Sequence, residues 1–256
     1  MLRRLGVLCG LLVLPTAVLA YADLLPGSLD LLGIDLRESP DLPHVARQIA
    51  IGAPLKIVAF GSSSTEGIGA SSPANAYPAR LQADLRKTLR GIDVAVINRG
   101  IGGEHVDDML ARLDRDVIKA EPQLVIWQTG SNDPLRGVPV AHFREVTLAA
   151  IRRIREAGID VVLMEPQWCP KLESTPGASR FLDAVRGIGE ELDVPVIRRA
   201  DLMHGWVQQG RLTTKQLFAS DGLHMADGGY ALLAEAAARS ILEDAGSVQT
   251  PEAVAE

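Results

Sequence analysis

From residue 55 onward, short apolar runs alternate with stretches of helical spacing, and this alternation constrains the fold more than any other feature. The five runs are Leu55–Phe60, Ile92–Ile97, Gln123–Thr129, Asp160–Glu165 and Val194–Ile197. A repeated strand–helix order is typical of a parallel sheet with helices on both faces. Nearly continuous apolar strands indicate burial on two sides. The sequence therefore predicts the α/β class: a three-layer α/β/α sandwich, flavodoxin-like, with a five-stranded parallel sheet.

Between the runs, apolar residues recur on single helical faces. These faces are Tyr77, Leu81, Leu85 and Leu89; Val146, Ala150 and Ile154; and Tyr230, Leu233, Ala237 and Ile241. We find no internal repeat and expect one domain over residues 55–245. Residues 23–54 have no clean periodicity and are interpreted as a lead-in that wraps onto the domain or stays partly loose. Residues 246–256 form a small, polar C-terminal tail.

The N-terminus carries the features of a signal peptide over residues 1–22. Arg3 and Arg4 precede an apolar run, and small residues stand at Ala20 and Ala22. A retained membrane anchor is the alternative, but the run is short for a spanning helix and contains Pro15. We therefore expect an exported protein, periplasmic or secreted, with no stable membrane insertion after cleavage.

Charge and cysteine usage exclude several classes. The net charge is −6, from 26 basic and 32 acidic residues, and it becomes −8 once the two leader arginines are removed. Because no basic cluster stands in the body of the chain, binding to nucleic acid is not expected. Without the leader, Cys169 is the single cysteine, so no intramolecular disulfide is expected and Cys169 is interpreted as a packed thiol.

Polar and glycine-rich segments follow the first three strands and precede the last helix. They are residues 61–67, 98–104, 130–133 and 221–224. Ligands of parallel sheets bind at the carboxyl ends of strands. Asp221 and His224 are three residues apart, so the carboxylate can orient the imidazole as a base. A serine on the strand-to-helix turn is the natural nucleophile, but spacing does not choose between Ser62, Ser63 and Ser64.

Two further segments offer donors for a developing oxyanion: the backbone N–H of Gly103 and the side-chain amide of Asn132. Each feature also has an ordinary structural explanation as a helix cap or a tight turn. The ordered set of four segments, each at a strand end, favours a complete acyl-transfer site.

These four segments resemble the blocks of the SGNH, or GDSL-type, serine hydrolases, in order, over residues 55–244. Gly61-Ser62-Ser63-Ser64-Thr65 is similar to the Gly-Asp-Ser-x-Thr signature, which implies Ser63 as the nucleophile. The other matches imply Gly103 and Asn132 as oxyanion donors, Asp221 as the orienting carboxylate and His224 as the base. Ser62 departs from the family's aspartate, which leaves the hydrogen bonding of this turn open.

The resulting hypothesis is a serine ester hydrolase that cleaves acyl esters, with short-chain or acetyl groups preferred, and needs no cofactor and no metal. The five histidines show no paired metal-ligand spacing: they are His44, His105, His142, His204 and His224. The alternatives are an O-acyltransferase acting on envelope carbohydrate, a lysophospholipase or thioesterase-like enzyme, and a non-catalytic carbohydrate-binding module. The expected partner is a small-molecule, carbohydrate or lipid ester. Trp168 either walls the substrate pocket or only packs against neighbouring loops.

Overall fold

The computed structural model describes residues 41–246. The predicted leader, the first part of the lead-in and the tail beyond residue 246 lie outside the described residues. All described residues fall within one compact unit. None of their helices is long and apolar enough to cross a membrane.

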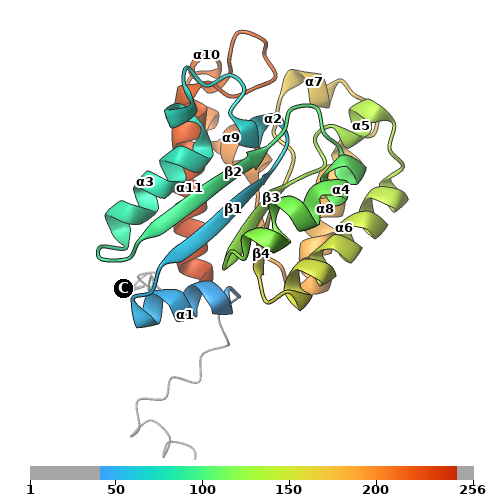
Figure 1. The fold of residues 1–256 in the computed structure, drawn as a ribbon. Helices are drawn as coiled ribbons and strands as arrows, with labels where there is room; N and C mark the ends of the chain where they lie inside the picture. Colours follow the sequence, from blue (N-terminus) through green and yellow to red (C-terminus); the bar gives the residue numbers. More distant parts are fainter. Residues whose placement is uncertain (1–40, 247–256) are drawn as a thin grey trace, which may run out of the picture. The chain divides into compact units, whose positions relative to one another are not determined.

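The residue ranges of the five strands agree closely with the five apolar runs identified in the sequence (Figure 1). They are β1 (Leu55–Gly61), β2 (Val94–Gly100), β3 (Leu124–Gln128), β4 (Asp160–Met164) and β5 (Val196–Ile197). All neighbouring pairs are parallel, in the order β2-β1-β3-β4-β5. This is the flavodoxin-like order, so the predicted fold class is confirmed.

Helical segments connect the strands. The longer helices are α1 (Pro43–Ile51), α3 (Tyr77–Thr88), α4 (Val106–Asp116), α6 (Val140–Glu156), α8 (Ser179–Leu192), α9 (Arg199–Gln208) and α11 (Asp227–Asp244). The short ones are α2 (Ser63–Glu66), η2 (Pro73–Asn75), η3 (Ile118–Ala120), α5 (Asp133–Arg136), α7 (Pro170–Glu173) and α10 (Thr214–Leu217).

Two hydrophobic cores lie on opposite faces of the sheet because alternate strand residues point to opposite sides. In β1, Ile57 and Ala59 pack into the core under α3, α9 and α11, whereas Val58 and Phe60 pack into the core under α4, α6 and α8. Figure 1 shows α3 and α11 on one side of the strands and α4 and α6 on the other. The helical faces expected from the sequence are buried in these cores, except that Leu89 caps α3 and is half-buried.

In the described part of the lead-in, residues 43–51 form helix α1, which packs onto the domain. Leu42 and Val45 are fully buried in the core. The Asp160 carboxylate at the start of β4 accepts the His44 and Val45 N–H groups, each at 2.9 Å, and contacts His44 Nδ1 at 2.7 Å. This carboxylate therefore caps the helix from a position far away in the sequence.

Candidate active site

The segments after β1, β2 and β3 meet at one edge of the sheet because the strands are parallel neighbours. Gly61 pairs with Gly100 at the ends of β1 and β2, so the two following loops leave the sheet side by side. Gly100 packs against the backbone of α2, where a Cβ on residue 100 would lie 2.0 Å from the Glu66 nitrogen. Only glycine allows this close approach of the helical turn to the second strand.

Ser63, His224 and Asp221 form a continuous chain of hydrogen bonds. The Ser63 Oγ lies 2.9 Å from His224 Nε2, and His224 Nδ1 lies 2.6 Å from Asp221 Oδ2. Ser63 is the first residue of α2, directly after β1, while the other two come from the loop before α11. The structure thus brings together three residues that span 161 positions of the chain.

The three serines of the turn differ in their surroundings. Ser62 and Ser64 are each 2% exposed, whereas Ser63 is partly exposed and contacts the imidazole. The spacing of the residues in the sequence does not distinguish these three serines. Ser63 is the residue that the family resemblance implied as the nucleophile, and the structure places its hydroxyl beside the imidazole.

Asp221 is held as a carboxylate by its partners. Partial burial alone would raise its pKa, but hydrogen bonds from the His224 ring and from the N–H groups of His224 and Leu223 outweigh it and lower the pKa to about 2. The two backbone bonds also fix the orientation of this carboxylate relative to the ring. The imidazole is therefore held with Nε2 toward Ser63, the geometry of a general base.

The hydrogen bonding left open by Ser62 is supplied by Gln128, the last residue of β3. Its Oε1 accepts the Ser62 N–H at 2.9 Å, the Ser62 hydroxyl at 3.0 Å and the Thr65 hydroxyl at 3.3 Å. Gln128 is fully buried, so these donors share one acceptor beneath the turn. Gln128 was not predicted as a site residue from the sequence. A polar side chain at the end of an apolar strand does, however, indicate a residue that forms hydrogen bonds with its neighbours.

Gln128 also connects the turn to a buried cation. Its Nε2 donates to Ser131 Oγ at 3.2 Å, and Ser131 in turn donates to Gln167 Oε1, which accepts from Arg199 at 2.8 Å. Arg199 is fully buried, and burial lowers its pKa to about 10. The floor of the site is thus a continuous polar network that spans the ends of β3, β4 and β5.

The loop after β2 carries the predicted donor Gly103 beside Ser63. Gly103 adopts a left-handed conformation, with φ of 79°, and its N–H has no acceptor among residues 41–246. The preceding residue, Gly102, lies next to Ser63: a Cβ on residue 102 would be in van der Waals contact with Ser63 Cβ, at 3.8 Å. Asn132 contacts the same loop, donating from Nδ2 to the Glu104 carbonyl at 2.8 Å.

A second residue missed by the sequence analysis, Arg112 of α4, joins the first two loops. It donates to the Gly61 carbonyl at 3.0 Å, to the Arg99 carbonyl at 2.9 Å and to the carboxylate of Glu104 at 2.6 Å. Arg112 is 5% exposed, and its guanidinium lies 4.3 Å from the centre of the Phe60 ring. Arg112 also pairs with Asp116 four positions later, a spacing typical of ordinary ion pairs on helix surfaces.

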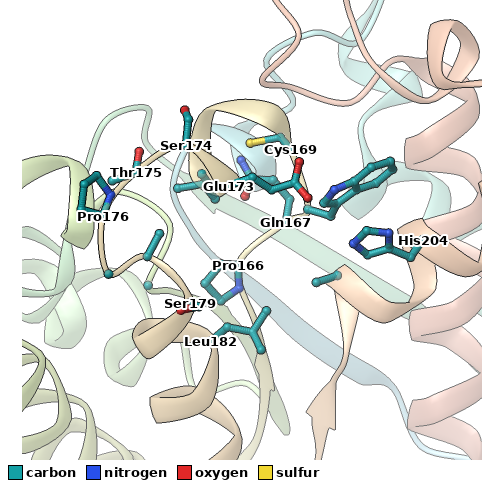
Figure 2. Close-up of a pocket in the computed structure, with 16 residues that line it drawn as sticks. Pro166, Gln167, Cys169, Glu173, Ser174, Thr175, Pro176, Ser179, Leu182 and His204 are labelled. Carbon is teal, nitrogen blue, oxygen red and sulfur yellow. The ribbon is translucent and has the colours of Figure 1, made fainter.

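A cavity of about 410 Å³ opens at the ends of β3, β4 and β5 (Figure 2). None of the five predicted site residues lines it, but Gly130, two positions before Asn132, does. Trp168 forms one wall and stacks on His204, with ring centres 4.1 Å apart. Cys169 is buried in the same wall, and burial raises the pKa of its thiol.

No cluster of three or more His, Cys, Asp or Glu side chains that could hold a metal ion occurs within residues 41–246.

Comparison with known sequences relates the chain to lipases and esterases. A model of the Non-GDSL lipase-like family matches residues 35–247. An arylesterase of Vibrio mimicus is 28% identical over 153 residues, which cover 60% of this chain and 72% of the relative. The uncharacterized lipoprotein YqeF of Bacillus subtilis (strain 168) is 26% identical over 169 residues, covering 55% of this chain and 69% of that one.

Solved structures share the fold. A two-domain esterase active on acetylated mannans superposes with a TM-score of 0.67 at 22% identity, over 84% of this chain and 55% of the other. The acetylxylan esterase Axe2 from Geobacillus stearothermophilus gives a TM-score of 0.62 at 22% identity, over 75% and 95% of the two chains. Since the family model spans most of the sequence, the chain belongs to the Non-GDSL lipase-like family, within the SGNH/GDSL-type lipases and esterases.

Proposed function

We propose that this chain, a hydrolase acting on ester bonds, cleaves acyl esters through a covalent acyl-enzyme on Ser63. The observation that carries the proposal is the chain of short hydrogen bonds from Asp221 through His224 to the Ser63 hydroxyl. A nucleophile, a base and a group that orients the base are the parts that such a reaction requires.

In this mechanism, Ser63 Oγ attacks the carbonyl carbon of the ester while His224 Nε2 accepts the hydroxyl proton. The N–H groups of Ser63 and Gly103 and the amide of Asn132 stabilise the negative oxygen of the tetrahedral intermediate. His224 then returns the proton to the departing alcohol as the C–O bond of the ester breaks. Water, activated by the same imidazole, releases the acid and restores Ser63. No cofactor or metal is assigned a step.

We propose short acyl groups, acetyl first, as the part of the substrate that is cleaved. The acetyl-carbohydrate esterases among the structures with this fold support this choice. The cavity beside Trp168 provides room for the larger part of the substrate, because it opens at the same sheet edge as Ser63. We further propose that the protein acts outside the cytoplasm, which the N-terminal leader pattern and the lipoprotein relative support.

A chain-length series of p-nitrophenyl esters tests the proposal. We expect kcat/KM to be highest for acetate or butyrate and to fall for octanoate and longer acyl groups. Preference for long chains would contradict the acetyl assignment, and the absence of turnover on every ester would contradict the activity itself. Product analysis with an added polysaccharide acceptor separates hydrolysis from acyl transfer.

A further inference from the structure

We propose that Glu66 is a positioning residue that holds the oxyanion-binding loop at a set distance from the nucleophile. The inference rests on the proposed function and adds a residue for which the sequence patterns gave no role. It concerns the backbone of residues 102–103, not the reacting groups themselves.

Glu66 belongs to the same helical turn as Ser63, and its backbone is anchored from two sides. Its N–H donates to the Ser62 carbonyl at 2.9 Å, and its own carbonyl accepts from the Asn98 side chain at 3.3 Å. Gly100 packs directly on this backbone. The Glu66 side chain therefore extends from a backbone segment that is held in place relative to Ser63.

The Glu66 carboxylate reaches across to the next loop. Its Oε2 accepts the Gly102 N–H at 2.7 Å, a short bond between a charged acceptor and a backbone donor. Two consecutive N–H groups in this loop thus differ in their hydrogen bonding. The Gly102 N–H donates to Glu66, whereas the Gly103 N–H has no acceptor within residues 41–246. Of these two groups, the Gly103 N–H therefore remains available as a donor.

The loop is held on its other side by residues that follow β3. Arg136 of α5 donates to the Gly103 carbonyl at 3.3 Å, and Asn132 donates to the Glu104 carbonyl at 2.8 Å. Among these side chains, Glu66 alone comes from the nucleophile's own turn. It therefore sets the separation between the attacking oxygen and the Gly103 N–H, which decides how well the donor reaches the developing oxyanion.

Loss of this acceptor is expected to reduce the rate of the chemical step and leave substrate affinity largely intact. A displacement of about 1 Å in a catalytic group can cost about 100-fold in rate, and an oxyanion donor contributes about 100- to 1000-fold. Because Arg136 and Asn132 still hold the loop, we expect an intermediate loss, about 10- to 100-fold in kcat.

The experiment compares Glu66→Gln, Glu66→Met and Glu66→Ala on p-nitrophenyl acetate. The amide oxygen of glutamine still accepts the Gly102 N–H, so Glu66→Gln should stay within about threefold of wild type. Methionine has nearly the same size but no comparable acceptor, so Glu66→Met and Glu66→Ala should lose about 10- to 100-fold in kcat with KM within about twofold. Glu156→Ala, at an exposed residue at the end of α6, is the matched control and should behave as wild type.

Equal kcat in Glu66→Met, Glu66→Ala and the control would overturn the inference, and so would a Glu66→Gln variant as slow as Glu66→Met. Thermal melting of each variant shows that it is folded, and Glu66→Ala decides the question if the methionine variant does not fold. Wild-type protein that turns over no ester would instead overturn the proposed function, and the inference with it. Normal wild-type turnover with unimpaired Glu66 variants would overturn the inference alone.

Discussion

Gln128 explains how the turn that carries Ser63 is held without the aspartate that the family signature contains. One buried amide oxygen accepts from the Ser62 N–H, the Ser62 hydroxyl and the Thr65 hydroxyl. A carboxylate at position 62 could not donate to this oxygen. The Ser62 hydroxyl thus donates to Gln128, at the position where the family signature has an acceptor.

Replacement of Gln128 by methionine tests this account. The variant keeps the volume but leaves the donors beneath the turn without their acceptor, so the free energy of unfolding should fall by about 1–3 kcal/mol. Urea denaturation measures the loss, and kcat on p-nitrophenyl acetate should fall with it as the turn loosens. Gln208→Met, at an exposed residue of α9, should change stability by less than about 0.5 kcal/mol. An equally small effect of Gln128→Met would contradict the account.

Asp221 gives a prediction for the pH dependence of stability. Its pKa in the folded protein, about 2, lies below the usual aspartate value of 3.8. A lowered pKa stabilises the fold above the unfolded value, and this stabilisation is lost as the pH falls through the folded value. Melting temperatures of wild type and Asp221→Asn should therefore differ by a constant amount from pH 6 to about 4, and the difference should shrink toward pH 2. A gap that stays constant down to pH 2 would contradict the lowered pKa of the Asp221 carboxyl.

At the scale of elements, helix α1 shows how a carboxylate on a strand can accept the unpaired N–H groups at the start of a helix. Asp160, at the amino end of β4, binds the first N–H groups of α1. Asp160→Ala should lower the free energy of unfolding by about 1–2 kcal/mol, the usual value of a cap. Hydrogen exchange at residues 43–51 should become faster, while ester turnover should be unchanged because the site lies at the opposite end of the strands. A loss of activity without a loss of stability would be the contrary result.

The same helix marks where local sequence patterns stop being informative. The strands were predictable because β-branched apolar runs stand out locally, and the long helices because their buried faces recur at helical spacing. Helix α1 was not, because its cap comes from Asp160, 116 positions away from His44. The last strand is shorter than expected, Val196–Ile197, since Pro195 has no N–H to offer the ladder.

Strand β2 is longer than its apolar run and continues through Arg99 to Gly100. It is an edge strand, so polar side chains there face solvent at little cost. This extension aligns the loop of Gly103 with the turn of Ser63 through the pairing of Gly100 with Gly61. The position of the Gly103 loop therefore depends on strand register, which the residues of either strand alone do not specify.

At the scale of the whole molecule, the fold gathers groups from four segments at one sheet edge. The motifs predicted His224, Asp221 and a serine of the turn, because each motif combines residue types that one reaction needs together, and the family resemblance implied Ser63 among the three serines. Gln128, Arg112 and Glu66 were not identified, since each is a single polar residue whose partners become neighbours only when the strands pair. Motifs thus indicate the reacting groups, and the tertiary structure is needed to find the residues that hold them.

The central claim is that Ser63 is the nucleophile of an ester hydrolase, and labelling with a fluorophosphonate probe tests it most directly. The probe forms a covalent bond to an activated serine, so its attachment site can be read by mass spectrometry after digestion. We predict stoichiometric labelling of the wild type on the peptide that contains Ser63, none in Ser63→Ala, and much slower labelling in His224→Ala. Labelling that persists in folded Ser63→Ala, or attaches to Ser62 or Ser64 in the wild type, would contradict the account.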